Sequence, residues 1–381
     1  MRPNVDGLVE PGFEGVRDAF VRNFAEHAEV GAGFCLHVEG RKVVDLWGGT
    51  FDETGDRPYD EETLQLVFSS TKGATASCFN LLVQRGLIDL DAPVSTYWPE
   101  FAQGGKAGIT VAQVLSHQAG LPGHVEPTTL QDQLDWARMC DQLARQAPAW
   151  APGTVNSYHA MTYGWLAGEI IRRVTGMSVA RYARETLTNP LSADFFIGLP
   201  AEFASRVAEI IPPLHVVTID EIDLPEVARM ALANPVQDPL FANSSACRAA
   251  EIPAANGHAS GRGVARLYAA LANGGVLGGV RILSPGTIDR MRTVQTTRPD
   301  LMLGFEPGWA MGMATNTVGI YGPRTATFGH SGWGGSFGCA DVETNVAIGY
   351  VMNQMGPELV GDPRTTPLCE AVFECVEKSG G

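Results

Sequence analysis

Apolar residues recur with a helical period near the start of this chain and with a strand period soon afterwards. The first pattern predicts an amphipathic helix over residues 12–27. The second predicts strands over 31–38 and 41–47, and the Glu39-Gly40 pair between them is typical of a hairpin turn. The N-terminal region is therefore expected to form a helix and an antiparallel strand pair.

The pattern changes between about residue 96 and residue 255, where helical periods and loops replace the strands. Helices are expected from Thr110 to Leu115 and over residues 131–145, 163–174 and 179–187. Residues 200–255 contain several prolines, and their pattern assigns no regular elements.

Strand patterns return in the last third of the chain. They follow a helix expected at 262–271 and a short helix expected to begin at Ser284-Pro285. Four strands and a closing helix are then expected, at residues 308–314, 325–329, 335–342, 346–352 and 367–377.

Strands at both ends of the chain with helices between them predict an α/β protein of the α+β type. We expect an antiparallel sheet flanked by helices, formed by residues 1–95 and 256–381. A mostly helical domain, residues 96–255, is expected as an insertion between these two halves. The active site is then expected in the cleft between the domains, where ligand sites commonly lie.

Composition narrows the class of protein. The chain has 381 residues, of which 45% are hydrophobic, so it can bury a large core and is too apolar for disorder. Its net charge of −15 argues against a nucleic-acid partner, because phosphate binding needs a basic surface.

Targeting features are also absent from the pattern. No apolar run reaches the length of a membrane span, and Met1–Gly7 lacks the apolar core of a signal peptide. The seven cysteines are odd in number and scattered, which is typical of reduced thiols in a cytoplasmic protein. Neither a membrane partner nor export is therefore expected, and the oligomeric state is left open.

The sharpest chemical signal lies where a short strand pattern, residues 64–68, runs into a helical one. Ser69 and Lys72 fall one turn apart there and can touch. A serine hydroxyl becomes a strong nucleophile when a base removes its proton, and a lysine kept neutral by burial can do so. The alternative is that Ser69 only caps the helix and Lys72 is solvated. Lysine is scarce in this chain, which argues against a general charged face around Lys72.

Two further stretches contain motifs in the order found in a known superfamily. Residues 152–160 read Pro-Gly-Thr-Val-Asn-Ser-Tyr-His-Ala, and residues 329–335 read Gly-His-Ser-Gly-Trp-Gly-Gly. Together with Ser69-Ser70-Thr71-Lys72 they resemble serine β-lactamases and penicillin-binding proteins. More closely, they resemble family VIII carboxylesterases, which are built on the class C β-lactamase fold. The resemblance covers nearly the whole chain and implies a β-lactamase/transpeptidase-like fold.

The resemblance implies roles for four residues. Ser69 would be the nucleophile, and Lys72 with Tyr158 would share the role of base, a cationic lysine favouring the phenolate of the tyrosine. Tyr158 would then return a proton to the leaving alcohol. The backbone N–H groups of Ser69 and Trp333 would form the oxyanion hole. A half-buried structural tyrosine and a core tryptophan are the alternatives for Tyr158 and Trp333.

Residues that bind substrate are implied at the second and third motifs. These are His159, His330, Ser331, Gly332 and Trp333. His330 stands where the lactamase relatives have a lysine, and Ala160 stands where they have an asparagine. Both differences weaken recognition of a charged, amide-bearing substrate and are compatible with a neutral ester. For His159 a structural role is an equally open alternative.

Residues 334–338 match the Gly-x-Ser-x-Gly elbow of α/β-hydrolases. That elbow requires an acid and a histidine later in the chain, and the last histidine is His330. Ser336 is therefore predicted to be structural. The histidines also lack the spacing of a metal site, so neither a metal nor a cofactor is expected.

These observations predict a serine carboxylesterase that hydrolyses small, short-chain esters through an acyl-enzyme on Ser69. A small-molecule ester is the expected partner. The alternatives are a β-lactamase or D-Ala-D-Ala peptidase, an acyltransferase that uses the same acyl-enzyme, and a catalytically silent binding protein on the same fold.

Overall fold

A seven-stranded antiparallel sheet organises the structure, which is a computed structural model describing residues 4–214 and 224–379. Residues 1–3 and 215–223 lie outside the described residues. The first range belongs to the N-terminal stretch in which no signal peptide is expected, and the second belongs to the region for which the sequence assigns no regular elements. The strand order is β1-β3-β2-β12-β11-β10-β9. The strands are β1 (Val5–Val9), β2 (Gly31–Val38), β3 (Arg41–Gly49), β9 (Ala314–Thr315), β10 (Thr327–Ser331), β11 (Phe337–Asp341) and β12 (Val346–Met352).

The two ends of the chain meet at the centre of this sheet. β2 forms the expected hairpin with β3 on one side and pairs with β12 on the other, with Ala32 opposite Met352. All seven residues of β12 are buried, because helices cover both faces of the sheet. The predicted antiparallel sheet assembled from both termini is therefore confirmed.

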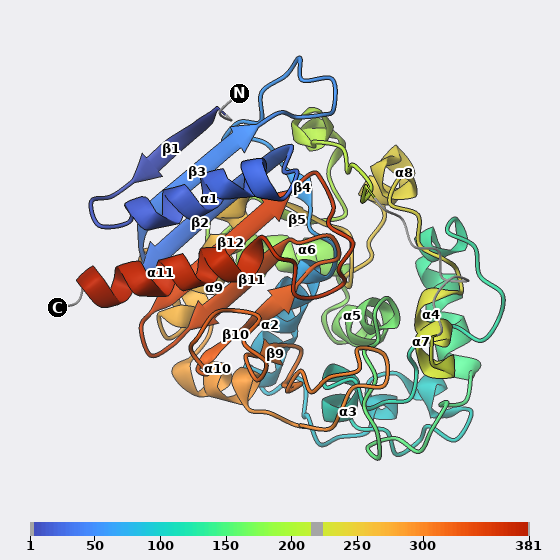
Figure 1. The fold of residues 1–381 in the computed structure, drawn as a ribbon. Helices are drawn as coiled ribbons and strands as arrows, with labels where there is room; N and C mark the ends of the chain where they lie inside the picture. The colour runs from blue at the N-terminus through green and yellow to red at the C-terminus, as the bar shows by residue number, and fades with distance from the viewer. Residues whose placement is uncertain (1–3, 215–223, 380–381) are drawn as a thin grey trace.

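Helices α1 (Glu14–Glu26) and α11 (Thr365–Ser379) lie side by side on one face of the sheet, and α9 (Gly261–Ala272) covers the other face (Figure 1). Close approach of α9 depends on a glycine in β12. A Cβ on Gly349 would lie 2.4 Å from the carbonyl oxygen of Gly261 and from the amide of Ala265. Helix α10 (Pro285–Arg292) follows, and the hydroxyl of Ser284 caps it as expected by accepting from the amide of Thr287.

Most of the remaining helices belong to the middle of the chain, and among them α5 (Thr162–Thr175) and α6 (Val179–Ala183) pack against α2 (Thr71–Gln84). The others are α3 (Val111–Leu115), α4 (Trp136–Arg145), α7 (Glu226–Leu232) and α8 (Ser245–Ala249). Thr110 caps α3 as predicted, its hydroxyl accepting from the amide of Gln113 at 3.2 Å. The predicted division into two domains stays a prediction.

Small sheets complete the fold. One contains β4 (Gln65–Leu66), β6 (Gly257–Ala259) and β5 (Phe195–Ile197), and the other contains β7 (Val276–Leu277) and β8 (Val280–Arg281). The strand predicted at 64–68 is thus shortened, because the chain turns at Phe68, whose φ is +40°. That turn places Ser69 directly before α2.

Two strand predictions need correction. β1 was not predicted, because its sequence is short, mostly exposed and interrupted by Gly7. The strand predicted at 308–314 is wrong, since only Ala314 of that stretch belongs to β9. Gly308 and Gly312 have φ angles of +59° and +83°, and they turn the chain away from extended geometry.

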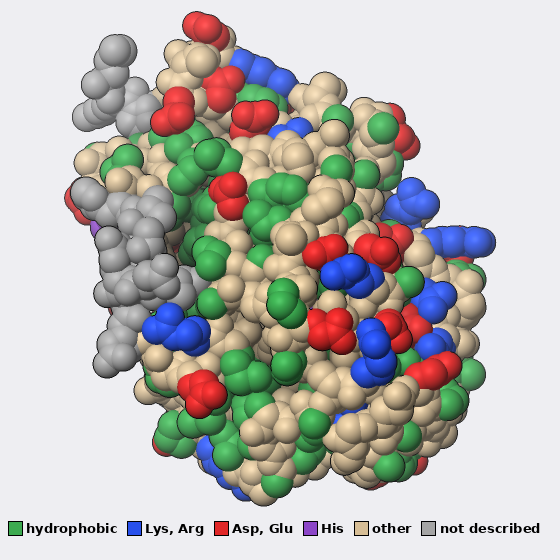
Figure 2. Space-filling model, turned by 90° about the vertical axis from the view of Figure 1, so that its right-hand side faces the viewer, with side chains coloured by type: hydrophobic (Ala, Val, Ile, Leu, Met, Phe, Trp, Pro, Cys, Tyr) green, Lys and Arg blue, Asp and Glu red, His purple; other side chains and the backbone are tan. Residues whose placement is uncertain are grey.

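Surface features agree with the mixed composition. Figure 2 shows a face on which acidic and basic side chains alternate. Some of the exposed charges form ion pairs, such as that of Arg145 with Asp141 at 2.7 Å. Among residues 4–214 and 224–379, no helix combines the length and the apolar character needed to cross a membrane.

Candidate active site

The turn before α2 holds Ser69 under backbone strain. Phe68 adopts a left-handed conformation although it is not a glycine, which costs on the order of 1–3 kcal/mol. Residues 68–70 form a single 3₁₀ turn, and the amide of Ser70 donates to the carbonyl of Val67 at 3.0 Å. Ser69 is therefore presented at a sharp bend rather than as the cap of α2.

Lys72 makes the contact with Ser69 that the sequence predicts. Its Nζ lies 3.0 Å from the Oγ of Ser69, 2.6 Å from the carbonyl oxygen of Ala160 and 3.0 Å from that of Ala254. The side chain is fully buried, which excludes the solvated alternative. Burial holds the pKa of Lys72 well below its usual range.

A neutral Lys72 matches this geometry. An uncharged amine has two N–H donors and one lone pair, and the two carbonyls take the two donors. The lone pair then faces the hydroxyl of Ser69, which can donate its proton. The arrangement is that of a general base in contact with its nucleophile.

Tyr158 completes this group. Its ring is buried, and its hydroxyl is hydrogen-bonded to that of Ser69. Burial raises the pKa of Tyr158; the bond to Ser69 lowers it, and the charge of Asp300 raises it further. Burial thus opposes both the ammonium form of Lys72 and the phenolate form of Tyr158, which counts against the expected phenolate beside a cationic lysine.

Asp300, which the sequence does not predict, positions Tyr158. One carboxylate oxygen accepts from the backbone amides of Tyr158, Met302 and Leu303 at 3.0–3.1 Å. The other oxygen accepts from the indole N–H of Trp309 at 2.7 Å. The Trp309 ring stacks on Tyr158 with centroids 5.2 Å apart. Asp300 thus fixes the backbone of Tyr158 directly and the position of its ring through Trp309.

His117 is a second neighbour of the site that the sequence reasoning missed. Its ring lies 5.1 Å from that of Tyr158 and 4.3 Å from that of Trp309. Burial holds its pKa well below the usual range, and the charges of His159 and Lys72 act in the same direction. His117 is 41 positions from Tyr158 in the sequence, so no local spacing identifies it as a neighbour of that residue.

His159 has the structural role. Its Nε2 accepts from the amide of Leu121 at 3.1 Å, and its Nδ1 donates to the carbonyl of Ser157 at 2.6 Å. Both ring nitrogens are therefore occupied within the protein. The substrate contact expected for His159 is corrected accordingly.

The third motif, residues 329–335, lies close to the nucleophile turn, which is formed by residues 67–70. A Cβ on Gly332 would be 2.2 Å from the carbonyl oxygen of Val67, so the two backbones approach directly. Trp333 is half-buried, and its ring packs edge-on against Phe68 at 5.4 Å. Among the described hydrogen bonds, none uses the amide of Ser69 or that of Trp333.

His330 is buried next to Tyr158 and Trp309. Its Nδ1 donates to the carbonyl of Ser331 at 2.9 Å. Burial lowers the pKa of His330 to about 3, and the charge of Lys72 adds to this effect. Ser331 contacts the hydroxyl of Tyr321 at 3.3 Å.

Ser336 is structural, as predicted. Its hydroxyl is completely buried, donates to the carbonyl of Val67 at 2.8 Å and lies 3.1 Å from the hydroxyl of Ser70. These bonds join the turn after β10 to the nucleophile turn. Within residues 4–214 and 224–379, no cluster of three histidine, cysteine or carboxylate side chains has the geometry of a metal site.

Comparison with known proteins places this chain in a family. The β-lactamase family profile matches residues 16–367. The chain belongs to the β-lactamase family. The expected β-lactamase-like fold is confirmed, and the expected class of serine hydrolase is confirmed with it.

Three β-lactamase-family relatives are informative. The esterase/beta-lactamase LipL of Mycobacterium tuberculosis is 38% identical over 93% of this chain and 84% of its own length. A crystal structure of a family VIII carboxylesterase is 45% identical, with a TM-score of 0.93 over 98% of this chain and 100% of the other. A penicillin-binding protein homologue from Caulobacter crescentus is 39% identical, with a TM-score of 0.92 over 98% and 100%. The resemblance to family VIII carboxylesterases is therefore confirmed.

Proposed function

We propose that this protein is a serine carboxylesterase that hydrolyses small, short-chain, uncharged esters through an acyl-enzyme on Ser69. The observation that carries the proposal is the contact between the Nζ of the fully buried Lys72 and the Oγ of Ser69, at 3.0 Å. Lys72 has a pKa well below its usual range, and His330 has a pKa of about 3. Burial thus disfavours the cationic forms of both side chains, which favours an uncharged ester over a substrate with a carboxylate.

Acylation follows from the contacts of Ser69. Its proton passes to the Lys72–Tyr158 pair while its Oγ forms a bond to the ester carbonyl carbon. The amides of Ser69 and Trp333 hold the negative oxygen that develops. When the bond to the alcohol oxygen breaks, the same pair returns a proton to that oxygen and an acyl-enzyme is left.

Deacylation uses the same groups with water in place of the alcohol. The pair takes a proton from water, the water oxygen bonds to the acyl carbon, and the bond to Ser69 Oγ breaks. The proton then returns to Ser69, and a carboxylic acid is released. An acyltransferase would differ only in using an alcohol as the acceptor, so product analysis with competing alcohols separates the two functions.

The relatives support this proposal. One of them is called an esterase/beta-lactamase and another a family VIII carboxylesterase. The first name favours β-lactam cleavage as a second activity of the same serine.

We also propose a cytoplasmic location. All seven cysteines are unpaired and buried, which supports it.

The test compares hydrolysis of p-nitrophenyl acetate, butyrate and octanoate with cleavage of nitrocefin. Ser69→Ala should abolish ester turnover and leave thermal unfolding nearly unchanged. Ser336→Ala is the matched control, because it removes the hydroxyl of the competing motif and should retain measurable turnover. Ester hydrolysis that persists in Ser69→Ala would reject the proposed nucleophile. Fast nitrocefin cleavage with poor ester turnover would favour the lactamase function.

A further inference from the structure

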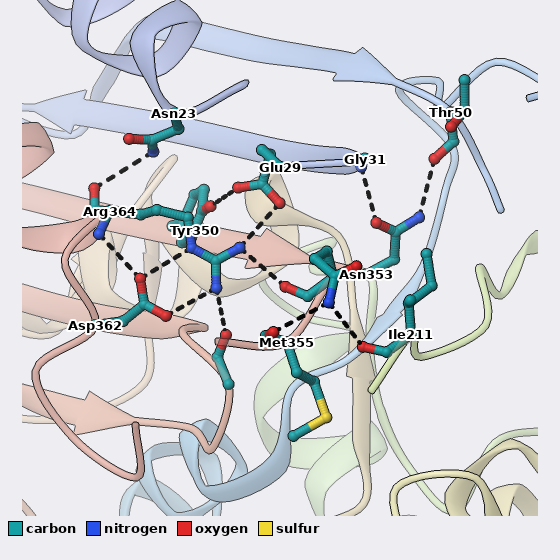
Figure 3. Close-up of polar contacts among 12 residues, drawn as sticks. Asn23, Glu29, Gly31, Thr50, Ile211, Tyr350, Asn353, Met355, Asp362 and Arg364 are labelled. Carbon is teal, nitrogen blue, oxygen red and sulfur yellow. Dashed lines mark hydrogen bonds and ion pairs between the residues drawn. The ribbon is translucent and has the colours of Figure 1, made fainter. Parts of the chain in front are cut away.

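A fully bonded arginine lies beneath the glycine turn that carries Trp333. Arg364 is 2% exposed, and its Nη2 donates to the carbonyl of Gly334 at 2.6 Å. Figure 3 shows its guanidinium between two carboxylates, those of Glu29 and Asp362. We propose that Arg364 is a positioning residue that fixes this turn, and through it the amide of Trp333, for ester hydrolysis. The inference rests on the proposed function.

The hydrogen bonds of Arg364 leave no donor unused. A guanidinium has five N–H groups. Two face Asp362, at 2.9 Å from Nε and 2.8 Å from Nη2, and one faces Glu29 at 3.1 Å from Nη1. The last two reach the backbone carbonyls of Gln354 and Gly334. Two carboxylates thus orient the arginine, and its remaining donors hold the chain.

The held turn is flexible by sequence. Residues 332–335 include three glycines, and Gly334 and Gly335 have φ angles of +87° and +123°. A chain of this kind has many accessible conformations, so external contacts must select one. The amide of Gly334 donates to the carbonyl of Glu358, and its carbonyl also accepts from the amide of Gly356.

The turn also packs directly on the ion pair. A Cβ on Gly335 would lie 2.7 Å from Nη2 of Arg364 and from Oδ2 of Asp362. The guanidinium and this backbone are therefore in direct contact. Trp333 is the neighbour of Gly334 in the chain, so a shift of Gly334 is expected to reach its amide.

Stability alone is a weak reason for such a cluster. Placing three ionisable groups in the interior carries a desolvation cost that a packed apolar side chain avoids. Glu29 is also tied to Tyr350 of β12 by a hydrogen bond from the tyrosine hydroxyl. The cluster thus connects the central sheet, the segment 354–364 and the glycine turn, which a positioning role explains.

The test uses substrates that differ at the oxyanion. Phenyl acetate places oxygen in the oxyanion hole, whereas O-phenyl thionoacetate places sulfur there, a poorer hydrogen-bond acceptor. Wild-type protein should strongly favour the oxygen ester. Arg364→Lys keeps the charge but loses the fork, and we expect kcat on phenyl acetate to fall at least about tenfold with little change in KM. The preference for oxygen over sulfur should shrink in parallel.

Glu169→Gln is the matched control, because Glu169 is another buried carboxylate that pairs with arginines, Arg172 and Arg173, away from the turn. It should lower the melting temperature without changing the substrate ratio. If Arg364→Lys does not fold, Asp362→Asn replaces it in the test. This variant weakens the bond between Asp362 and Nη2 of Arg364, the nitrogen that also holds Gly334. It should shift the ratio of oxygen-ester to sulfur-ester turnover in the same direction. A folded variant of either kind with the wild-type ratio overturns the inference. An inactive wild-type protein would instead reject the proposed function.

Discussion

The Nζ of Lys72 lies 3.0 Å from the Oγ of Ser69, while the carbonyls of Ala160 and Ala254 take its other two hydrogen-bonding directions. This relationship explains how an amine can act as a base in the interior. Burial disfavours the ammonium ion, and the two carbonyls orient the remaining amine so that its lone pair faces the serine.

Removal of this amine should abolish catalysis. We expect Lys72→Met to lower kcat/KM for p-nitrophenyl acetate by about 10³-fold or more, because general-base activation of the nucleophile is lost. Lys106 offers a matched control. It is also buried, but its Nζ donates to three backbone carbonyls, those of Gln103, Ala144 and Gln146. Lys106→Met should lower stability and spare turnover of the folded protein, and comparable loss in both variants would contradict the assignment.

The rate should depend on pH in one direction over the neutral range. Lys72 acts when neutral, so kcat/KM should fall as pH falls through its lowered pKa. Burial raises the pKa of Tyr158, so the phenol keeps its proton at moderately alkaline pH. A profile from pH 5 to pH 10 should therefore rise and then level off. A fall in rate between pH 7 and pH 9 would contradict these protonation states.

Asp300 should add to the effect of burial on the pKa of Tyr158 as well as fix its position. Asp300→Asn removes a negative charge that raises the pKa of Tyr158, so that pKa should fall and a loss of activity should appear at lower pH on the alkaline side. We expect kcat to decrease about tenfold, because one of the two oxygens, which accept from the Tyr158 amide and the Trp309 indole respectively, is replaced by a donor.

Asp341 provides the comparison for that variant. It is a buried aspartate at the C-terminal end of β11. It accepts from the backbone amides of Glu343 and Thr344 at 3.0 and 2.9 Å. Asp341→Asn should reduce stability to a similar extent without moving the pH profile. If both variants leave the alkaline limb unchanged, Asp300 acts on structure alone.

His330 should decide between neutral and charged substrates. Its buried Nε2 has no hydrogen-bond partner among the described residues, and its pKa of about 3 keeps the ring neutral. His330→Lys would place an ammonium where a substrate carboxylate can pair with it. We expect nitrocefin cleavage to rise by about tenfold, since a charge-assisted hydrogen bond contributes about 1.5–3 kcal/mol. His330→Gln, which is neutral, should show no such gain.

The elements predicted well are those whose partners are close in sequence. The hairpin of residues 31–38 and 41–47 follows from local alternation, and the Ser69–Lys72 contact follows from one turn of helix. Asp300 could not be predicted as a site residue, because its acceptors serve the amide of Tyr158, which is 142 positions away.

The backbone conformation of Phe68 and the pKa of Lys72 could not be predicted from nearby sequence either. The positive φ of Phe68 is unusual for an aromatic residue, and nothing in its sequence neighbourhood requires it. The lowered pKa of Lys72 depends on complete burial, to which the segments around Ala160 and Ala254 contribute. Residues distant in the sequence therefore bury Lys72 and orient it toward Ser69, which the short motif alone does not guarantee.

Glu29 should make stability depend on pH between about 4.5 and 7. Burial raises its pKa from 4.5 to about 7, although the charge of Arg364 and the bond from Tyr350 oppose this and the charge of Asp362 adds to it. In the folded protein Glu29 therefore holds a proton that the unfolded chain has already lost. The free energy of unfolding must then fall as pH rises through this interval, by at most about 3 kcal/mol, and stay level above it.

Glu29→Gln should remove that slope, because glutamine does not titrate. Melting temperatures of the wild type and the variant, measured from pH 5 to pH 8, should converge at the alkaline end or cross in favour of the variant. Glu169→Gln tests the sign. Burial alone would raise the pKa of Glu169, but hydrogen bonds from Arg172, Trp136 and Arg173 hold it below its usual value. Its removal should therefore lower stability almost equally across pH 5 to 8, so parallel curves for Glu29→Gln and wild type would show that Glu29 is ionised throughout.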